Sequence, residues 1–350
     1  MSHGANKKRS FEYIKLIAAC FVVFIHVRFP GMTGRVFDAI ARFAVPFFFA
    51  CSGYFSFQIG SARLAKRLRH IMFLILSTTA LYSVYDAAQF VLSGKGTLWR
   101  YLAVTFTAKS VARWLFMNLP PGSAYHLWYL PAALTCYAVL WLYVKFQEDS
   151  GAPLDYRPLY MAGAALLMIH VMCSLKFVGA GMKLHYNAYR DGLFFGLPMF
   201  CTGVFIREYR DRLVRAFHLT TGGGLVLFIV GQAFGVFQFI QIGKVEMPLG
   251  AFFSIFGLLL FAAGVAEREE SSPWKDACAR VAGSCSLTVY VMHVMIHQVV
   301  YVAAKSSPFW AGVVNAKSAY PLVIAGLSLL LGLAVASVKE VRRMFFSVKG

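Results

Sequence analysis

The chain has 350 residues, of which 59% are hydrophobic and only 14% are charged. Soluble domains carry about a quarter charged residues, so this composition excludes an ordinary soluble protein and indicates a polytopic membrane protein. The net charge of +19 does not indicate nucleic-acid binding, because the basic residues lie in short clusters between apolar runs, as expected beside anionic lipid headgroups. The seven cysteines contain no CxxC pair, so we expect buried hydrophobic side chains, with neither disulfides nor a metal site.

The first apolar run, residues 11–28, is long enough to cross a bilayer but contains Glu12, Lys15 and His26. A charge at mid-membrane costs about 2.5–3.5 kcal/mol, so such residues indicate function by default. Eleven residues turn a helix by about 1100°, close to three full turns, which places Lys15 and His26 on one face roughly 16 Å apart. Glu12 lies close to the same face. In the alternative interpretation, Lys15 extends to the lipid headgroups and His26 is an interfacial residue.

Nine further apolar runs of similar length follow, so we predict an all-α bundle of about ten transmembrane helices in one domain covering residues 1–350. The predicted spans are 11–28, 38–58, 71–92, 126–145, 158–175, 190–206, 220–240, 247–266, 283–304 and 319–338. The N-terminal segment 1–10 and the C-terminal tail 339–350 are basic, which predicts that both ends are cytoplasmic.

Three features interrupt this regular pattern. Pro46 and the Ser52-Gly53 pair are expected to bend the second span, which also contains Arg42. Residues 93–125 form a long segment between spans, which predicts a functional loop or additional helices. Asp191 lies at the start of the sixth span, and it is expected either to line a cavity or to form an ion pair with Arg42.

Several motifs together resemble the membrane-bound acyltransferase-3 family, whose members O-acylate cell-surface carbohydrates. The family has Asp-x-x-Arg where this chain has Glu12 and Lys15, and Lys15 cannot form the bidentate contacts of arginine. The motifs appear in the family's order and cover most of the chain. They are Glu12-x-x-Lys15, Lys15-x10-His26, VPFFFACSGYF at 45–55, Arg67-Leu68-Arg69, PPGSAYHLWYL at 120–130, and Ser286-x3-Tyr290-x2-His293.

The resemblance implies an acyl-CoA donor, most simply acetyl-CoA, as co-substrate without a bound cofactor. Arg67 and Arg69, on the predicted cytoplasmic side, would bind its phosphates. They would align best in an extended segment, because residues i and i+2 diverge on a helix. Alternatively, both are ordinary basic anchors at the cytoplasmic surface.

His26 is the best candidate general base, because an imidazole with an ordinary pKa near 6.5 can remove a proton from an acceptor hydroxyl at neutral pH. Glu12 and Lys15 are too distant to touch it, and we assign them to helix packing and donor binding as a partly buried ion pair. An unpaired Lys15 would instead assist a phosphate or a developing oxyanion.

The acceptor is expected to be a cell-envelope carbohydrate or a lipid-linked sugar. Ser123, His126 and Trp128 in the PPGSAYHLWYL segment offer hydrogen bonds and a stacking face suited to a sugar, although interfacial aromatic belts also explain the tryptophan. Arg42 and His293 are further cavity candidates, and His293 suits a packing or polar-lining role. His293 and His297 have metal-ligand spacing, but no acidic residue lies between them, so no metal site is predicted.

The sequence therefore predicts a multi-pass O-acyltransferase of a bacterial cytoplasmic membrane, with the bilayer, acyl-CoA and a sugar acceptor as partners. The main alternative is a transporter or flippase that exports a polysaccharide or lipid-linked sugar without chemistry, since intramembrane charges suit that function too. A third interpretation is a structural subunit of an envelope-synthesis complex, in which the charges only hold helices together.

Overall fold

A computed structural model describes residues 9–179, 190–217, 221–243, 247–270 and 272–338, and these residues are mostly helical with no strand among them. The predicted cytoplasmic tail 339–350 and residues 1–8 of the N-terminal segment lie outside the described residues. The chain divides into two compact units, of which the first comprises residues 9–55 and 203–338 and the second residues 56–202. The boundary falls within helix α9 (Leu197–Phe217).

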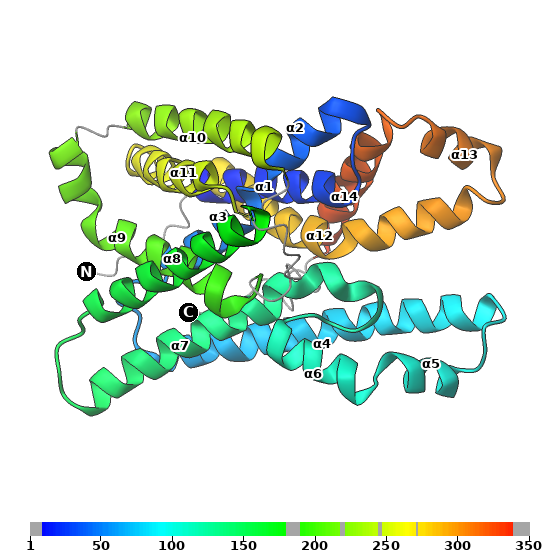
Figure 1. Ribbon diagram of the computed structural model, residues 1–350, viewed down its shortest axis with the longest axis horizontal. Helices are drawn as coiled ribbons and strands as arrows, with labels where there is room; N and C mark the ends of the chain where they lie inside the picture. The colour runs from blue at the N-terminus through cyan, green and yellow to red at the C-terminus, as the bar shows by residue number, and fades with distance from the viewer. Residues whose placement is uncertain (1–8, 180–189, 218–220, 244–246, 271, 339–350) are drawn as a thin grey trace. The chain divides into compact units, whose positions relative to one another are not determined.

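The first unit is organised around α1 (Arg9–His26), which packs against helices from both ends of the sequence. Its strongest neighbour is α12, which in turn packs on α14, and α10 pairs with α11 (Figure 1). The helices of this unit other than α1 and α9 are α2 (Gly31–Ala41), α3 (Ala44–Tyr54), α10 (Thr221–Ile242), α11 (Leu249–Glu267), α12 (Pro273–Ala303), α13 (Pro308–Asn315) and α14 (Tyr320–Ser337).

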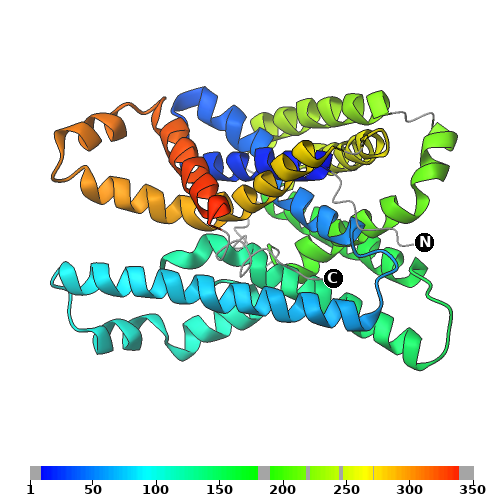
Figure 2. The same cartoon turned by 180° about the vertical axis from the view of Figure 1, so that it is seen from behind.

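In the second unit, the long helix α4 packs along α7, as both ribbon views show (Figure 1, Figure 2). The segment 93–125 carries two helices and the start of a 3₁₀ turn, which confirms that it has secondary structure of its own. The elements are α4 (Ser61–Leu92), α5 (Leu98–Thr105), α6 (Ala108–Met117), the 3₁₀ helix η1 (Gly122–Trp128), α7 (Tyr129–Asp149), α8 (Arg157–Gly179) and the π-helical turn η3 (Gly192–Gly196).

Seven helical segments of the described chain are long and apolar enough to cross a bilayer, so the predicted multi-pass, all-α class holds but the count of about ten is not confirmed. These segments are Gly31–Tyr54, Ser61–Leu92, Ala108–Asp149, Thr221–Ile242, Leu249–Glu267, Pro273–Ala303 and Tyr320–Ser337. The first predicted span falls outside this set: α1 is 18 residues long and carries Arg9, Glu12 and Lys15.

The second predicted span begins earlier than expected, at Gly31, and is broken into α2 and α3 at residues 42–43. Pro46 explains the position of the break, because proline has no N–H to donate to the carbonyl of Arg42 and its ring clashes with that carbonyl. The bend therefore lies about one turn before the proline and carries Arg42 at its corner.

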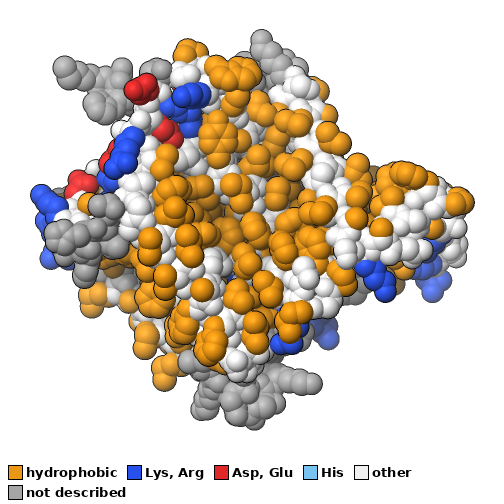
Figure 3. Space-filling model, turned by 90° about the horizontal axis from the view of Figure 1, so that it is seen from above, with side chains coloured by type: hydrophobic (Ala, Val, Ile, Leu, Met, Phe, Trp, Pro, Cys, Tyr) orange, Lys and Arg blue, Asp and Glu red, His pale blue; other side chains and the backbone are white. Residues whose placement is uncertain are grey.

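Helix α10 presents a broad apolar surface. Figure 3 views the side on which α10 and α2 lie in Figure 1 and shows hydrophobic side chains gathered there, with Lys and Arg at the margins. The exposed large residues of α10 include Val226, Ile229, Val230 and Phe237. A face of this kind is suited to contact with lipid.

Glycines allow the backbones of α10 and α11 to approach closely. A methyl group added at Gly257 would lie 2.6 Å from the carbonyl oxygen of Gly224, and one at Gly231 would lie 2.6 Å from the backbone nitrogen of Ser254. Small residues stabilise helix pairs in membranes in this way, because packing replaces the hydrophobic effect as the driving force.

We expect Gly257→Ala to destabilise the protein by about 1–3 kcal/mol, since the added methyl group forces α10 and α11 apart. The measurement is the thermal unfolding midpoint in detergent. Gly326→Ala on α14 is the matched control, because a methyl group there meets no atom within 4 Å. Equal midpoints for the two variants would contradict the close-packing account.

Candidate active site

His26, the last residue of α1, lies beside His293 of α12, with the two ring centroids 5.1 Å apart and the ring planes inclined by 48°. His26 is partly exposed, whereas His293 is fully buried. The structure therefore brings together the first and last histidines of the sequence motifs. Of the two rings, only that of His26 is partly exposed.

Glu12 and Lys15, near the start of α1, form an ion pair with Nζ and Oε1 2.8 Å apart. Glu12 is buried against Gly283 of α12, where a β-carbon would collide with its carboxylate. Glu12 and His26 thus face the same neighbouring helix, as the helical spacing predicts. The alternative of an unpaired Lys15 is wrong, because Glu12 holds its ammonium group.

Two histidines of α12 have defined hydrogen bonds. Nδ1 of His293 lies 2.9 Å from the carbonyl oxygen of Val289, one turn earlier on the same helix. Nδ1 of His297 lies 2.7 Å from the hydroxyl of Tyr320 on α14. Within the described residues, no group of three or more His, Cys, Asp or Glu side chains could hold a metal ion.

Arg42 forms a buried ion pair with Asp38, one turn earlier, with Nη2 and Oδ1 2.7 Å apart. The ring of Phe239 lies beneath its guanidinium group at 6.0 Å. Asp191 instead accepts hydrogen bonds from the backbone N–H groups of Leu193 and Phe194 at the start of η3. Burial raises the pKa of Asp191 above its ordinary value, and these N–H donors act in the opposite direction. Asp38 was missed by the sequence analysis, although its spacing of four from Arg42 is the signal for such a pair.

Arg67 and Arg69 both lie on α4, so the segment does not have the extended conformation in which the two side chains would align best. Two residues apart on a helix, they diverge by about 200°. Arg67 is partly buried, donates a hydrogen bond of 2.8 Å to the hydroxyl of Ser56, and lies over the ring of Tyr137 at 5.8 Å. Arg69 is exposed.

Ser123 in η1 is held by Asp86 of α4, a residue that the sequence analysis did not single out. The carboxylate accepts the backbone N–H of Ser123 at 2.8 Å and its hydroxyl at 2.7 Å. Gly122 turns the chain with φ +69°, and a β-carbon there would lie 2.5 Å from Asp86. Burial raises the pKa of Tyr101 on α5, and the charge of Asp86 raises it further.

His126 and Trp128, also in η1, are buried within the second unit. The ring nitrogen Nε2 of His126 lies 3.3 Å from the hydroxyl of Tyr82 on α4, and the guanidinium group of Arg190 lies 5.0 Å from the ring of Trp128. Together with Ser123, these side chains fix η1 against its neighbours. A role for them in acceptor binding stays a prediction.

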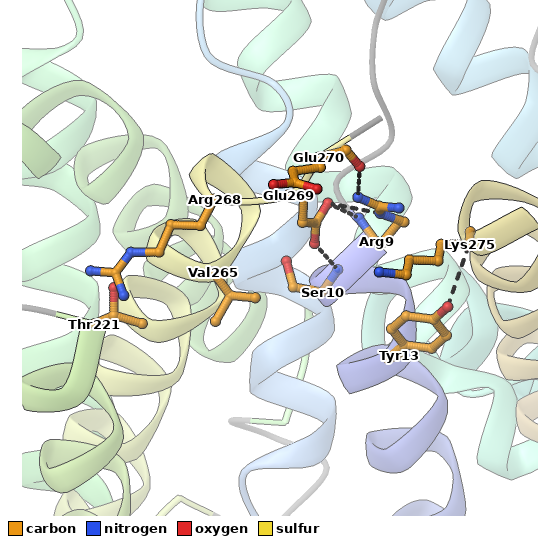
Figure 4. A pocket seen from close by; sticks show the side chains of 9 residues that line it. All are labelled: Arg9, Ser10, Tyr13, Thr221, Val265, Arg268, Glu269, Glu270 and Lys275. Carbon is orange, nitrogen blue, oxygen red and sulfur yellow. Dashed lines mark hydrogen bonds and ion pairs between the residues drawn. The ribbon is translucent and has the colours of Figure 1, made fainter. Parts of the chain in front are cut away.

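A cavity of about 410 Å³ lies at the opposite end of α1 from His26 (Figure 4). The carboxylate of Glu269 accepts hydrogen bonds from the backbone N–H groups of Arg9 and Ser10 at 2.9 and 2.7 Å. It therefore provides acceptors for N–H groups that have no partner within the first turn of α1. The guanidinium group of Arg9 also contacts the Glu270 carbonyl. The cavity is lined by Arg9, Ser10, Tyr13, Thr221, Val265, Arg268, Glu269, Glu270 and Lys275. Its distance from His26, roughly 24 Å along the helix, separates it from the histidine pair.

We expect Asp86→Ala to destabilise the second unit by about 1–3 kcal/mol, because the Ser123 donors lose their acceptor and η1 loses its anchor. Asp86→Asn keeps one carbonyl oxygen and should lose less. The measurement is the thermal unfolding midpoint together with the rate of proteolysis near residues 118–123. An Asp86→Ala variant that unfolds and is cleaved like the wild type would show that Asp86 does not anchor η1.

Comparison with known proteins agrees with this architecture. The model of the family described as "Acyltransferase domain" matches residues 8–338. A protein named amino-acid racemase from Enterococcus faecalis is 26% identical over 218 residues, which cover 57% of this chain and 28% of that protein. The match thus spans less than a third of that relative's length. No solved structure matches the chain significantly. From the extent of the family match, this chain belongs to the acyltransferase-3 family.

Proposed function

We propose that this chain is a membrane O-acyltransferase that moves an acetyl group from cytoplasmic acetyl-CoA to a hydroxyl of a cell-envelope carbohydrate. The observation that carries the proposal is the position of His26. Its imidazole is partly exposed at the end of a helix otherwise packed against α12, in a chain of the acyltransferase-3 family. A base that must meet substrate needs this combination of a fixed helix and an accessible ring.

In the proposed reaction, His26 removes the proton from the acceptor hydroxyl as its oxygen attacks the thioester carbonyl. The new C–O bond forms and the C–S bond breaks. The CoA thiolate leaves and takes up the proton carried by the imidazolium, which restores the base. Whether the acyl group passes directly or through an acyl-enzyme, the acceptor hydroxyl must lose this proton.

Arg67 is the proposed contact for the phosphates of the donor. Its guanidinium group is already held in position by Ser56 and Tyr137, so little side-chain entropy is lost when it meets a phosphate. Arg69 is exposed on the same helix and would contribute through its charge at longer range. Glu12 and Lys15 would shape the site as a packed ion pair, with their net charge close to zero.

Membership of the acyltransferase-3 family supports the proposed acceptor and setting. We propose a sugar hydroxyl presented at or beyond the outer half of a bacterial cytoplasmic membrane, with both chain termini in the cytoplasm. His126 and Trp128 would contribute to acceptor recognition after η1 shifts, because both are buried in the present arrangement. Racemisation is not proposed, since the match to the racemase covers only 28% of that protein.

The proposal predicts that His26→Ala lowers the release of free CoA from acetyl-CoA by about 10²–10⁴-fold, the usual contribution of a general base. The assay uses purified protein in nanodiscs with an envelope extract as acceptor. His297→Ala is the matched control, because His297 has its own partner in Tyr320. Absence of both donor binding and CoA release in folded wild-type protein would overturn the enzyme and favour a transporter.

The proposed donor site predicts that Arg67→Ala raises the KM for acetyl-CoA by about 10-fold or more, because a charged hydrogen bond contributes about 1.5–3 kcal/mol. The turnover number should change less. Arg63→Ala removes an exposed charge from the same helix and controls for the general effect of net charge. Equal KM values in the two variants would place the donor elsewhere.

A further inference from the structure

We infer that Arg28 binds an anionic substituent of the acceptor, a carboxylate or a phosphate, and so holds the acceptor's hydroxyl group beside His26. The inference rests on the proposed function and deepens it, because it names the acceptor as an acidic sugar. Arg28 is the second residue after His26, which is the last residue of α1. Two residues of chain span at most about 7 Å, so the backbone of Arg28 lies next to that of the proposed base.

The guanidinium group of Arg28 folds back over the end of α1. Its Nε atom donates a hydrogen bond of 3.4 Å to the carbonyl oxygen of Ile25, the residue before His26. The last carbonyl groups of a helix have no partner within the helix and carry partial negative charge, so they favour a cation at this position. The positive charge of Arg28 is therefore held beside His26 by the helix that ends there.

An aromatic cluster fixes the turn that carries Arg28. The ring centroid of Phe29 lies 5.2 Å from that of Phe24 on α1 and 4.5 Å from that of Phe37 on α2. Gly34 on α2 permits this close approach, because a β-carbon there would collide with the carbonyl oxygen of Phe29. The backbone that follows Arg28 is thus held against both helices, so less conformational entropy is lost when the arginine meets a ligand.

Arg28 adds positive charge to a site whose carboxylate is already paired. Asp38 of α2 contacts the buried Arg42 at 2.7 Å, and Nη2 of Arg28 lies 3.7 Å from the second carboxylate oxygen. One carboxylate thus faces two guanidinium groups. Asp38 is the only acidic residue between positions 16 and 55, whereas Arg35 adds a third arginine to the same stretch. An anionic group on a ligand complements this excess of positive charge.

The two contacts of Arg28 leave one end of its guanidinium group for a ligand. Nε and Nη2 form one edge of the planar group, and this edge faces Ile25 and Asp38. The other terminal nitrogen, Nη1, takes part in neither contact, and the side chain is 53% exposed. Nη1 and the second hydrogen of Nη2 form the end-on fork that pairs with two oxygens of a carboxylate or phosphate.

The exposure of Arg28 favours a bound anion over a developing one. Oxyanion stabilisation depends on donors in a site that excludes water, where electrostatic interactions are strongest. A half-exposed side chain instead suits a group that is already charged in the free ligand, because that charge also attracts the ligand during association. Uronic acids and sugar phosphates carry such a charge together with the hydroxyl groups that the transfer needs.

Three probes with the same sugar ring test the preference for an anion. Methyl glucuronide has a carboxylate on its exocyclic carbon, a second probe is methyl glucoside phosphorylated on the same carbon, and methyl glucoside itself is neutral. Binding is measured by saturation-transfer NMR with protein in nanodiscs of zwitterionic lipid, without acetyl-CoA and against empty nanodiscs. The two charged probes distinguish uronic acids from sugar phosphates as the source of the anion.

We expect at least one charged probe to bind the wild type about 5- to 10-fold more tightly than the neutral glycoside, between the effects of an exposed ion pair and a charged hydrogen bond. Arg28→Gln should abolish this difference and leave the affinity for the neutral glycoside unchanged. Arg28→Lys should retain part of it, because lysine keeps the charge without the fork. Arg35→Gln is the matched control, since it removes an exposed charge from α2 and should keep the preference.

The second measurement is CoA release from acetyl-CoA with the preferred charged glycoside as acceptor. We expect the KM for this glycoside to rise about 5- to 10-fold in Arg28→Gln, with the KM for acetyl-CoA unchanged. An equal fall in kcat with charged and neutral acceptors would assign Arg28 to the reaction's oxyanion and overturn its role in acceptor binding.

The inference is also wrong if the wild type binds all three probes equally or binds none of them, or if the preference survives in Arg28→Gln. Because binding is measured without donor, absence of CoA release in the wild type would refute the proposed function alone. The binding result would still decide whether Arg28 selects an acidic sugar. Should Arg28→Gln fail to fold, Arg28→Met replaces it, because methionine also keeps an apolar stem without the charge.

Discussion

The packing of α1 on α12 is the constraint on which the candidate active site depends. At one end, Glu12 occupies the space that Gly283 leaves free, and a side chain at that position would collide with the carboxylate. At the other end, the same pairing places His26 beside His293. The two contacts fix both the register and the rotation of α1, since a helix held at two points about four turns apart cannot turn about its axis. The position of His26, the proposed base, is thus determined partly by a glycine far from it.

Three charged side chains within the described helices have partners that are close in sequence or in the same unit. Lys15 is held by Glu12, Arg42 by Asp38, and Asp86 by the donors of Ser123. Such local pairs reduce the desolvation free energy of a charge in an apolar setting. Removing one partner leaves the other charge with its full desolvation free energy uncompensated. Charges alone therefore do not mark a substrate path here. The partly exposed imidazole of His26 is the more informative feature.

Local periodicity was sufficient to predict the orientation of side chains on one helix. It was insufficient to predict contacts between helices. The spacing of Glu12, Lys15 and His26 gave their common orientation, because helical geometry acts over a few turns. The bend before Pro46 was expected for the same reason, although its position one turn earlier depends on the carbonyl that the proline displaces. Arg67 and Arg69 would have aligned best in an extended segment, but α4 begins at Ser61 and continues through them. The contacts of Asp86 with Ser123, and of His26 with His293, join residues distant in sequence, and no periodic signal reports such contacts.

The difference in burial between the two histidines bears on how a polar reaction can occur inside an apolar bundle. A base must be reached by its substrate, but an exposed imidazole exchanges freely between tautomers and hydrogen-bond partners. A buried imidazole is fixed by its surroundings but cannot meet a hydroxyl. In this chain the requirements fall on separate residues: His293 is fully buried and bonded to its own helix, and His26 is partly exposed at the end of α1. Their ring centroids lie 5.1 Å apart, so the partly exposed ring packs against a ring that its own helix holds in place.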